Sequence, residues 1–297
     1  MTAHGTTTFT TTRTAMCDCH VHVFDPARFA YTEPRRFTPG TATVAQLQQH
    51  LAALGVQRVV LVQPSVYGHR HHALVDALDA LNAFTDTARG VAVLSAHNTT
   101  AEVDALARAG VVASRLNLAV HGHCEAEDAW QQLQAMERRT PHDWHIQLHA
   151  PLAVLATLAP KLAKTPRTFV VDHLGLPGPN LQPTHPHWQT LLRWLETERV
   201  YVKLSAPYLA SAQPVGHTDL QALLLSLMAV APHRLLWGSN WPHTQGTSRA
   251  PGADAMKPEP FREVDDAHWL RLCQQWAGVH AHALTTDNAA QLYRFSN

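Results

Sequence analysis

The stretch that decides the fold is CDCHVHVFD, residues 17–25, which places His20 and His22 at the end of a short apolar run. Side chains two residues apart on a β-strand point to the same side. The strand therefore predicts both imidazoles on one face, with Cys19 and Val21 on the other. Two imidazoles on one face can bind a metal, or can polarise a substrate oxygen and move protons. Because the chain has 22 histidines, such a pair can also arise by chance.

The composition favours a protein that acts on small molecules. The 297 residues carry no net formal charge, so nothing marks a nucleic-acid or anionic-membrane surface. No apolar run reaches the roughly 18 residues of a membrane span. The cysteines Cys17, Cys19, Cys124 and Cys273 lack CxxC or zinc-ribbon spacing, and we expect reduced thiols in a cytoplasmic protein. Residues 1–16 are rich in threonine without an apolar signal core, and we expect a disordered leader.

Strand-like runs alternate with helix-like segments along the whole chain, as in a parallel α/β protein. The expected strands are 17–24, 58–65, 90–95, 111–117, 145–149, 168–173, 200–205 and 235–240. The expected helices are 43–54, 71–84, 101–109, 126–139, 151–163, 186–198, 217–230, 264–276 and 286–294.

Eight strand–helix repeats in this length favour a (β/α)8 TIM barrel, class α/β, over an open sheet. We expect a single barrel domain over residues 17–297. A doubly wound sheet would be supported by a glycine-rich phosphate loop after the first strand, but the chain contains neither GxGxxG nor GxxxxGK[ST]. The stretch 245–262, rich in Gly, Pro and Ala, is the one long irregular segment, and such segments are often lids or binding loops.

Polar residues end seven of the eight expected strands, which core filling alone does not explain. In a barrel of this kind the carboxyl ends of the strands meet at the active-site face. The residues so placed are His20, His22, Gln63, Ser65, Tyr67, Arg115, Asn117, Gln147, His149, Asp172, His173, Lys203, Ser205, Tyr208, Asn240 and His243. We expect a site here. Tyr67 and Tyr208 can equally pack at the rim, and Lys203 can be a solvated loop residue or a counter-ion to Asp172.

Several motifs at these strand ends resemble the amidohydrolase superfamily, and within it the amidohydrolase-2 branch typified by 2-pyrone-4,6-dicarboxylate lactonase. The motifs are DCHVHVF (18–24), VQPSVYG (62–68), VDHLG (171–175), LWGSNWPH (236–243) and TDNAAQLY (286–293). Together they cover nearly the whole chain. The resemblance implies a (β/α)8 hydrolase.

The resemblance also implies where a metal would bind. Metal-dependent members use HxH on strand one, a carboxylated Lys or a Glu on strand four, His on strands five and six, and Asp on strand eight. This chain supplies His20, His22, His149 and His173, so a divalent metal such as zinc on these four histidines stays an alternative. Its fourth strand carries Arg115, a permanent cation that cannot bind a metal. We therefore expect no metal or other cofactor.

Metal-independent lactonases of the branch suggest the roles. The resemblance implies that Arg115 binds a substrate carboxylate and that His20, His22 and His173 polarise the lactone carbonyl. From the residues themselves, Arg115 can hold a carboxylate bidentately. The substrate-binding set that we expect is Gln63, Ser65, Tyr67, Arg115, Asn117, Gln147, His149, Lys203, Ser205 and Tyr208.

Asn240 is the departure that matters most. The resemblance to lactonases of this branch implies an Asp there that activates the attacking water, and an asparagine cannot take up a proton at neutral pH. Another base such as His243 or His149 can replace it, the enzyme can isomerise its lactone instead, or the site can bind without turnover. The predicted catalytic set is His20, His22, His173, Asn240 and His243.

Three functions therefore stay open. The first is a hydrolase of a small carboxylated lactone, the second a metal-dependent amidohydrolase or decarboxylase of the same fold, and the third a non-catalytic binder of small acids. The expected partner is a small-molecule lactone or carboxylic acid, with no nucleic acid, no membrane and a possible homo-oligomer. His121 lies where some relatives carry a second Arg, so the number of acid groups on the substrate is open.

Overall fold

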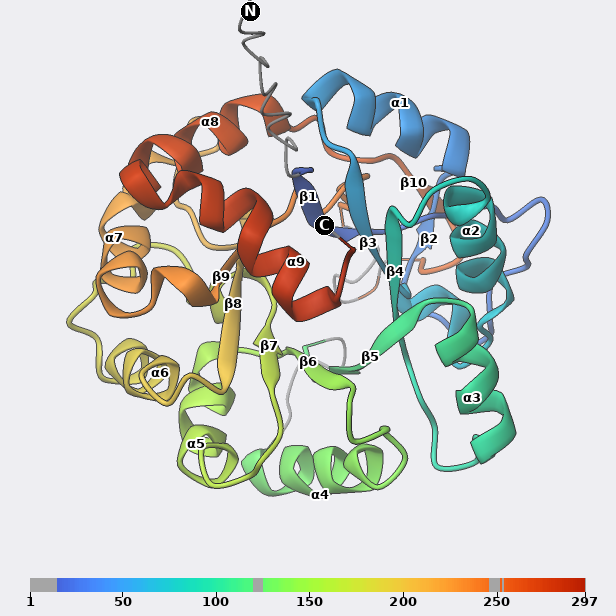
Figure 1. Cartoon of the computed structure of the whole chain (residues 1–297), viewed down its shortest axis with the longest axis horizontal. Helices are drawn as coiled ribbons and strands as arrows, with labels where there is room; N and C mark the ends of the chain where they lie inside the picture. The colour runs from blue at the N-terminus through green and yellow to red at the C-terminus, as the bar shows by residue number, and fades with distance from the viewer. Residues whose placement is uncertain (1–14, 120–124, 246–251, 253, 297) are drawn as a thin grey trace, which may run out of the picture.

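A computed structural model describes residues 15–119, 125–245, 252 and 254–296. It confirms the expected barrel: eight parallel strands form the wall and helices surround them (Figure 1). Residues 1–14 of the expected leader, His121, Cys124 and part of the 245–262 stretch lie outside the described residues. The cysteines within the described ranges, Cys17, Cys19 and Cys273, are free and buried.

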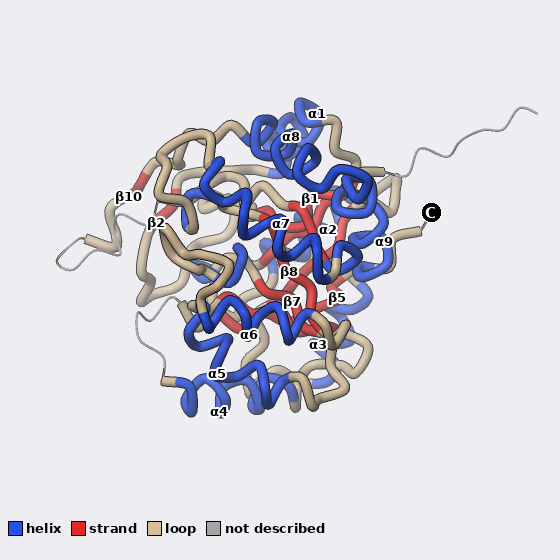
Figure 2. The backbone as a smooth tube through the Cα atoms, turned by 90° about the vertical axis from the view of Figure 1, so that its left-hand side faces the viewer, coloured by secondary structure: helices blue, strands red, loops and turns tan. Residues whose placement is uncertain are grey.

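The wall follows chain order, with neighbouring strands paired in parallel. Its strands are β1 (Cys17–Val21), β3 (Arg58–Val62), β4 (Ala88–Ala92), β5 (Val111–Asn117), β6 (His145–His149), β7 (Phe169–Val171), β8 (Val200–Leu204) and β9 (Leu235–Trp237). A separate parallel pair, β2 (Thr38–Pro39) and β10 (Pro258–Glu259), lies on the loop side of the molecule (Figure 2).

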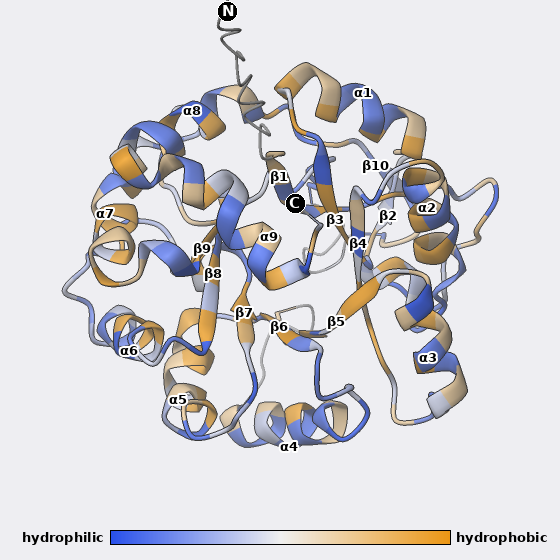
Figure 3. Ribbon diagram, viewed as in Figure 1, coloured by the Kyte–Doolittle hydropathy of each residue, from blue (hydrophilic) through white to orange (hydrophobic). Residues whose placement is uncertain are grey.

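Local sequence signals mark the ends of some of the helices. They are α1 (Val44–Leu54), α2 (His72–Asn82), α3 (Thr100–Arg108), α4 (Ala126–Glu137), α5 (Leu152–Leu162), α6 (Pro186–Leu195), α7 (Gln221–Val230), α8 (Asp266–Ala277) and α9 (Asn288–Tyr293). Thr43 and Thr99 start α1 and α3 with capping boxes, and Gly55 ends α1 in the left-handed region at φ 69°. The ring helices carry a hydrophobic face toward the wall and a hydrophilic outer face (Figure 3).

The first and last strands close the barrel at the active-site end. Val21 pairs in parallel with Trp241, and the backbone of Asn240 donates to the His20 carbonyl over 2.9 Å. This approach needs Gly238, because a Cβ there would lie 3.0 Å from the His20 Cβ and backbone N. Closure therefore fixes His20 beside Asn240.

The barrel interior has an apolar lower layer. Cys17, Cys19, Val60, Val62, Val91, Ala113, Val170, Tyr201 and Leu236 pack there with Ala289, Tyr293 and Phe295. Helix α9 thus plugs the amino-terminal end of the barrel, across the opening seen in Figure 1. The polar strand-end residues lie in the layer above, toward the opposite face.

Three expectations about local structure are wrong. Cys19 faces the barrel interior with Cys17 instead of opposite the histidines, because the pairing of β1 with β3 shifts register between Asp18 and Val21, which breaks strict alternation. Several strands end earlier than predicted, β9 at Trp237 for instance, since their polar ends turn into loops. The 245–262 stretch is not wholly irregular, because Pro258–Glu259 forms β10.

Candidate active site

A fully buried carboxylate, Asp172 at the end of β7, organises the centre of the site. Its Oδ2 accepts hydrogen bonds from Arg115 Nε at 3.0 Å and Gln147 Nε2 at 3.1 Å. Its Oδ1 lies 3.2 Å from His20 Nδ1 and 3.7 Å from Lys203 Nζ. Lys203 also donates to Gln147 Oε1 at 2.7 Å. Of the two interpretations of Lys203, the counter-ion to Asp172 is therefore confirmed.

Charge balance keeps Asp172 ionised. Burial alone raises the pKa of this carboxyl, but its contacts with His20 and with the cations Arg115 and Lys203 outweigh burial and hold the pKa well below its ordinary value. Burial lowers the pKa of Lys203, although Asp172 opposes that shift. The cluster is a local concentration of positive charge beneath the cleft.

The histidines pack ring against ring above this centre. The His20 ring centroid lies 5.0 Å from that of His22 and 4.5 Å from that of His173, and the His149 ring lies 5.1 Å from His173. Burial lowers the pKa of His22 to about 4 and that of His173 to about 3, and the nearby Arg115 charge adds to both shifts. Burial also holds the pKa of His20 well below its ordinary value. These imidazoles are therefore neutral at pH 7.

Hydrogen bonds orient two of these rings. His22 Nδ1 lies 2.7 Å from the Val62 carbonyl and must donate to it, so neutral His22 offers an acceptor at Nε2. His173 Nδ1 lies 2.8 Å from Ser205 Oγ. When the hydroxyl donates, the proton of His173 is on Nε2, where it can polarise a carbonyl. His173 itself holds a left-handed backbone at φ 52°.

These groups meet at a cleft of about 90 Å³. The predicted residues that line it are His22, Ser65, Arg115, Asn117, His149, His173, Tyr208 and Asn240. A neighbouring cavity of about 600 Å³ shares Ser65, Arg115 and Asn117 with the cleft and adds the cations Arg35 and Arg36. The cleft and the cavity therefore share a polar wall with a cationic residue, Arg115, which suits a small anionic molecule.

Other predicted residues lie beneath or beside the cleft. His20, Gln147, Lys203 and Ser205 are buried under it. Gln63 does not line it: its Nε2 donates to the Gly68 carbonyl at 2.6 Å and its Oε1 accepts from the Val93 amide at 3.2 Å. Tyr67 accepts from the Asp25 amide at 2.9 Å and is buried at the rim. Both hold the loop after β3 in shape.

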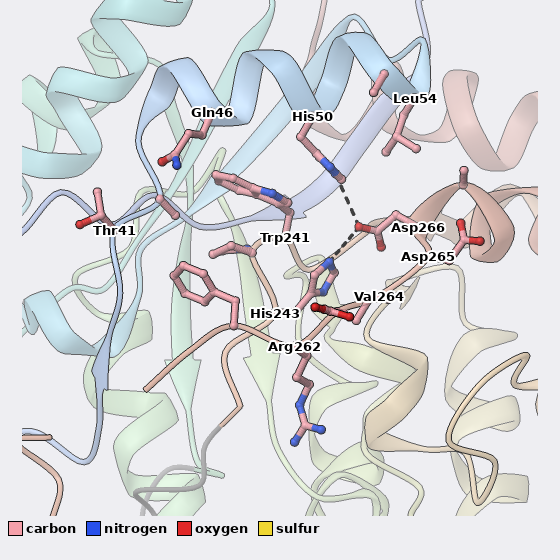
Figure 4. Close-up of a pocket in the computed structure, with 16 residues that line it drawn as sticks. Thr41, Gln46, His50, Leu54, Trp241, His243, Arg262, Val264, Asp265 and Asp266 are labelled. Atoms are coloured by element: carbon pink, nitrogen blue, oxygen red, sulfur yellow. Dashed lines mark hydrogen bonds and ion pairs between the residues drawn. The ribbon is translucent and has the colours of Figure 1, made fainter. Parts of the chain in front are cut away.

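Asn240 and His243 lie on opposite sides of Tyr208. Asn240 Nδ2 donates to Tyr208 Oη at 2.8 Å, and His243 Nδ1 lies 3.5 Å from the same oxygen. His243 Nε2 lies 2.8 Å from Asp266 Oδ2, and His50 Nε2 approaches the same oxygen at 3.6 Å (Figure 4). His243 faces a second cavity of about 590 Å³ between α1 and the start of α8.

The sequence analysis missed Asp266, His50 and Asp18. Asp266 begins α8 and carries only the ordinary signal of a helix start. Asp18 is fully buried, and its Oδ1 accepts from the backbone amides of His20 and Ser239. Burial raises its pKa to about 7. The Asp18-x-His20 spacing was the available signal for a carboxylate that braces β1.

The donor set is a poor fit for a resident divalent cation. Among the described residues, the only clustered group of possible ligands is His20, Asp172 and His173. Asp172 Oδ2 already accepts hydrogen bonds from Arg115 and Gln147. Asp172 Oδ1 makes no hydrogen bond to the described residues, but it faces His20 at 3.2 Å and Lys203 at 3.7 Å. A metal would also sit beside two cationic side chains. The expected four-histidine set is not grouped, since His22 and His149 stand outside the cluster.

Comparison with known proteins agrees with this architecture. A family model described as Amidohydrolase, of the amidohydrolase-2 type, matches residues 17–295, and the chain belongs to this family. It is a hydrolase by that membership, in a branch whose characterised relatives act on lactones.

Two curated relatives are similar over most of their length. A 4-sulfomuconolactone hydrolase from Rhizobium radiobacter is 28% identical over 288 residues, 93% of this chain and 89% of the relative. A 2-pyrone-4,6-dicarboxylate hydrolase from Comamonas testosteroni is 29% identical over 236 residues, 76% of each chain.

A solved structure matches throughout the barrel. It is a probable 2-pyrone-4,6-dicarboxylic acid hydrolase from Acinetobacter baumannii with citric acid bound, at a TM-score of 0.75 and 27% identity, covering 95% of this chain and 100% of that one. Among the helices of the described residues, none has the length and apolar character needed to span a membrane.

Proposed function

We propose that this protein hydrolyses a small lactone that carries at least one carboxylate, without a bound metal. The observation that carries the proposal is Arg115, which lines the cleft while Asp172 fixes its Nε at 3.0 Å. A guanidinium held at one nitrogen presents its remaining donors in a defined direction, which suits a carboxylate beside the reacting ring. The relatives named for lactone hydrolysis support the same class of substrate.

Ser65 and Asn117 flank Arg115 on the wall that the cleft shares with the larger cavity. In the proposal they donate hydrogen bonds to the substrate acid or hydroxyl groups. Arg35 and Arg36 add positive charge farther out, so a second acid group on the ring is accommodated there. The related solved structure has citric acid bound, which is a small carboxylic acid of the class proposed here.

In the proposal, His173 polarises the lactone carbonyl through Nε2–H, with Ser205 holding the opposite ring nitrogen. The buried positive charge of Lys203 and Arg115 favours the oxyanion as it develops. His20 lies between Asp172 and the His173 ring and positions that ring by packing against it. His22 and His149 accept hydrogen bonds from the substrate at the cleft. Gln147 bridges Asp172 and Lys203 through its side-chain amide. Gln63 and Tyr67 hold the rim loop in its conformation.

The proposal also covers the partner, the location and the cofactor of the protein. The partner is a small molecule and neither a nucleic acid nor a membrane, and the free thiols among the described residues support a cytoplasmic location. The homo-oligomer stays a prediction. In the proposal no cofactor takes part, because Arg115 and Lys203 place two positive charges beside Asp172, where a cation would bind.

The test compares 2-pyrone-4,6-dicarboxylate with its dimethyl ester, before and after treatment with a chelator. We expect hydrolysis of the diacid, a kcat/KM for the diester at least tenfold lower, and unchanged activity after chelation. Activity that is lost on chelation and restored by zinc would favour the metal-dependent alternative instead. Tight binding of the diacid without turnover would favour the binding protein.

A further inference from the structure

The cleft lacks a carboxylate to take a proton from water. None of the described residues that line it is an Asp or a Glu, and Asp172 beneath it is held ionised by Arg115 and Lys203. Asn240, which lines the cleft, has a neutral side chain that cannot accept a proton at neutral pH. A hydrolase with this cleft needs a base from elsewhere.

A continuous line of polar contacts leaves the cleft beside Asn240. Tyr208 lines the cleft, and its Oη lies 3.5 Å from His243 Nδ1. His243 Nε2 lies 2.8 Å from Asp266 Oδ2, with both side chains buried. His243 does not itself line the cleft, so any proton that it takes from there must pass through Tyr208. The 3.5 Å contact is long, as contacts of catalytic groups often are before substrate binds.

The hydrogen bonds of His243 and Tyr208 determine which of their atoms donate and which accept. Asp266 Oδ2 accepts the 2.8 Å hydrogen bond from His243 Nε2–H, which leaves Nδ1 as the acceptor that faces Tyr208. Asn240 Nδ2 donates to Tyr208 Oη at 2.8 Å, which directs the phenol proton toward His243. An Asp at position 240 would compete for that proton. Asparagine is therefore the residue that this arrangement requires.

We propose that Tyr208, His243 and Asp266 form a proton relay that serves as the base for this cleft. This inference rests on the proposed lactone hydrolysis. As water attacks the lactone carbonyl carbon, its proton passes to Tyr208 Oη while the phenol proton passes to His243 Nδ1. The imidazolium pairs with Asp266. When the ring C–O bond breaks, the proton returns through Tyr208 to the leaving oxygen, which restores all three groups.

Two further features support the relay. The Arg262 guanidinium lies 5.1 Å from the centroid of the Tyr208 ring, where a cation favours negative charge developing on the phenol. Asn240 Oδ1 is buried and makes no hydrogen bond to the described residues, so it is available to hold the attacking water. Asn240 and Tyr208 would then orient one water between them.

The far side of the relay opens into the cavity of about 590 Å³ shown in Figure 4. His50 stacks on Trp241 there and faces Asp266 from α1, while Arg262, Glu263 and Asp265 contribute the other charged groups. A small base can thus reach the His243 position without entering the substrate cleft. This access makes a direct chemical test possible.

The test uses hydrolysis of 2-pyrone-4,6-dicarboxylate by Tyr208→Phe and His243→Ala, with Tyr31→Phe as the matched control. Tyr31 packs against Tyr67 at the rim, outside the cleft. We expect kcat to fall on the order of 10²- to 10⁴-fold in both relay variants with KM nearly unchanged. We expect less than a twofold change in Tyr31→Phe. Added imidazole should restore kcat in His243→Ala but not in Tyr208→Phe.

Tyr208→Phe with wild-type kcat, or His243→Ala that imidazole does not restore, would overturn the relay while leaving lactone hydrolysis standing. A second measurement needs no substrate: ¹⁵N NMR of the His243 ring at neutral pH. The relay predicts a proton on Nε2 and a bare Nδ1. A proton on Nδ1 with a bare Nε2 would overturn the relay even if the wild-type protein hydrolysed none of the lactones tried.

Discussion

Lys203 and Asp172 lie side by side on neighbouring strands, with both side chains completely buried and Nζ 3.7 Å from Oδ1. One charge comes from the end of β8 and the other from the end of β7. Neither charge has access to water. Loss of either one would therefore destabilise the folded barrel and also change the charge beneath the cleft.

Removing one member of this pair should be costly. Lys203→Met leaves the Asp172 charge with fewer partners, and we expect the free energy of unfolding to fall by about 3–5 kcal/mol. Urea unfolding of Lys203→Met, Asp172→Asn and the double variant measures the coupling. The double variant should lose less than the two single losses summed. A loss below about 1 kcal/mol in Lys203→Met would contradict the pairing.

Arg115→Lys tests the carboxylate contact. A lysine keeps the charge but loses the planar fork and the Nε bond to Asp172. We expect KM for 2-pyrone-4,6-dicarboxylate to rise about 10- to 100-fold, the loss of one charge-assisted hydrogen bond. The dimethyl ester should be affected much less. Equal losses on both substrates, measured by initial rates, would remove Arg115 from carboxylate recognition.

The buried histidines predict a stability that falls in acid. Burial lowers the pKa of His22 to about 4 and those of His145 and His173 to about 3. Between these values and about 6.5, the unfolded chain binds more protons than the folded one. Each histidine therefore lowers the free energy of unfolding by up to about 1.4 kcal/mol per pH unit as the pH falls.

Asp18 acts in the opposite direction, because burial raises its pKa to about 7 and the folded state takes up a proton there first. The histidines with lowered pKa values outnumber the one aspartate with a raised pKa. The net effect is therefore a fall in the free energy of unfolding below pH 6.5. Urea unfolding at pH 7.5, 6.5, 5.5 and 4.5 measures the slope. His145→Gln, far from the cleft at the start of β6, should flatten it. Constant or rising stability toward pH 4.5 would be inconsistent with these shifts.

Asn240→Asp separates two explanations of the missing carboxylate. If Asn240 is simply a lost base, aspartate should raise kcat. In the relay, the new carboxylate accepts the Tyr208 proton, interrupts transfer to His243, and lowers kcat at least tenfold. Steady-state kinetics on 2-pyrone-4,6-dicarboxylate decide between them. An Asn240→Asp enzyme faster than wild type would be evidence for the first explanation.

The barrel could be predicted because its signals are local and repeated. Alternating apolar strands, the capping threonines Thr43 and Thr99 and the terminal glycine Gly55 of α1 each act over a few residues. Strand ends were less predictable, because Trp237 and Val62 end their strands where tertiary contacts redirect the chain. The inward Cys19 depends on a register shift that single-strand periodicity does not contain.

The pattern of strand ends predicted which residues gather at the site, but not which of them contact one another. Strand-end polarity brought Arg115, His173 and Asn240 to one cleft. It could not distinguish Gln63, which serves the backbone, from residues that face substrate. Asp266 was missed because its partner His243 lies 23 residues earlier, and only the folded chain joins them.

The measurement that tests the central claim most directly is the number of protons released per molecule of 2-pyrone-4,6-dicarboxylate converted, followed in a pH-stat at pH 8 with chelator-treated protein. Opening the lactone creates one new carboxyl group, which is ionised at this pH. The account predicts one proton released for each ring opened. Substrate conversion without proton release, as in isomerisation, or substrate binding without conversion, would contradict it.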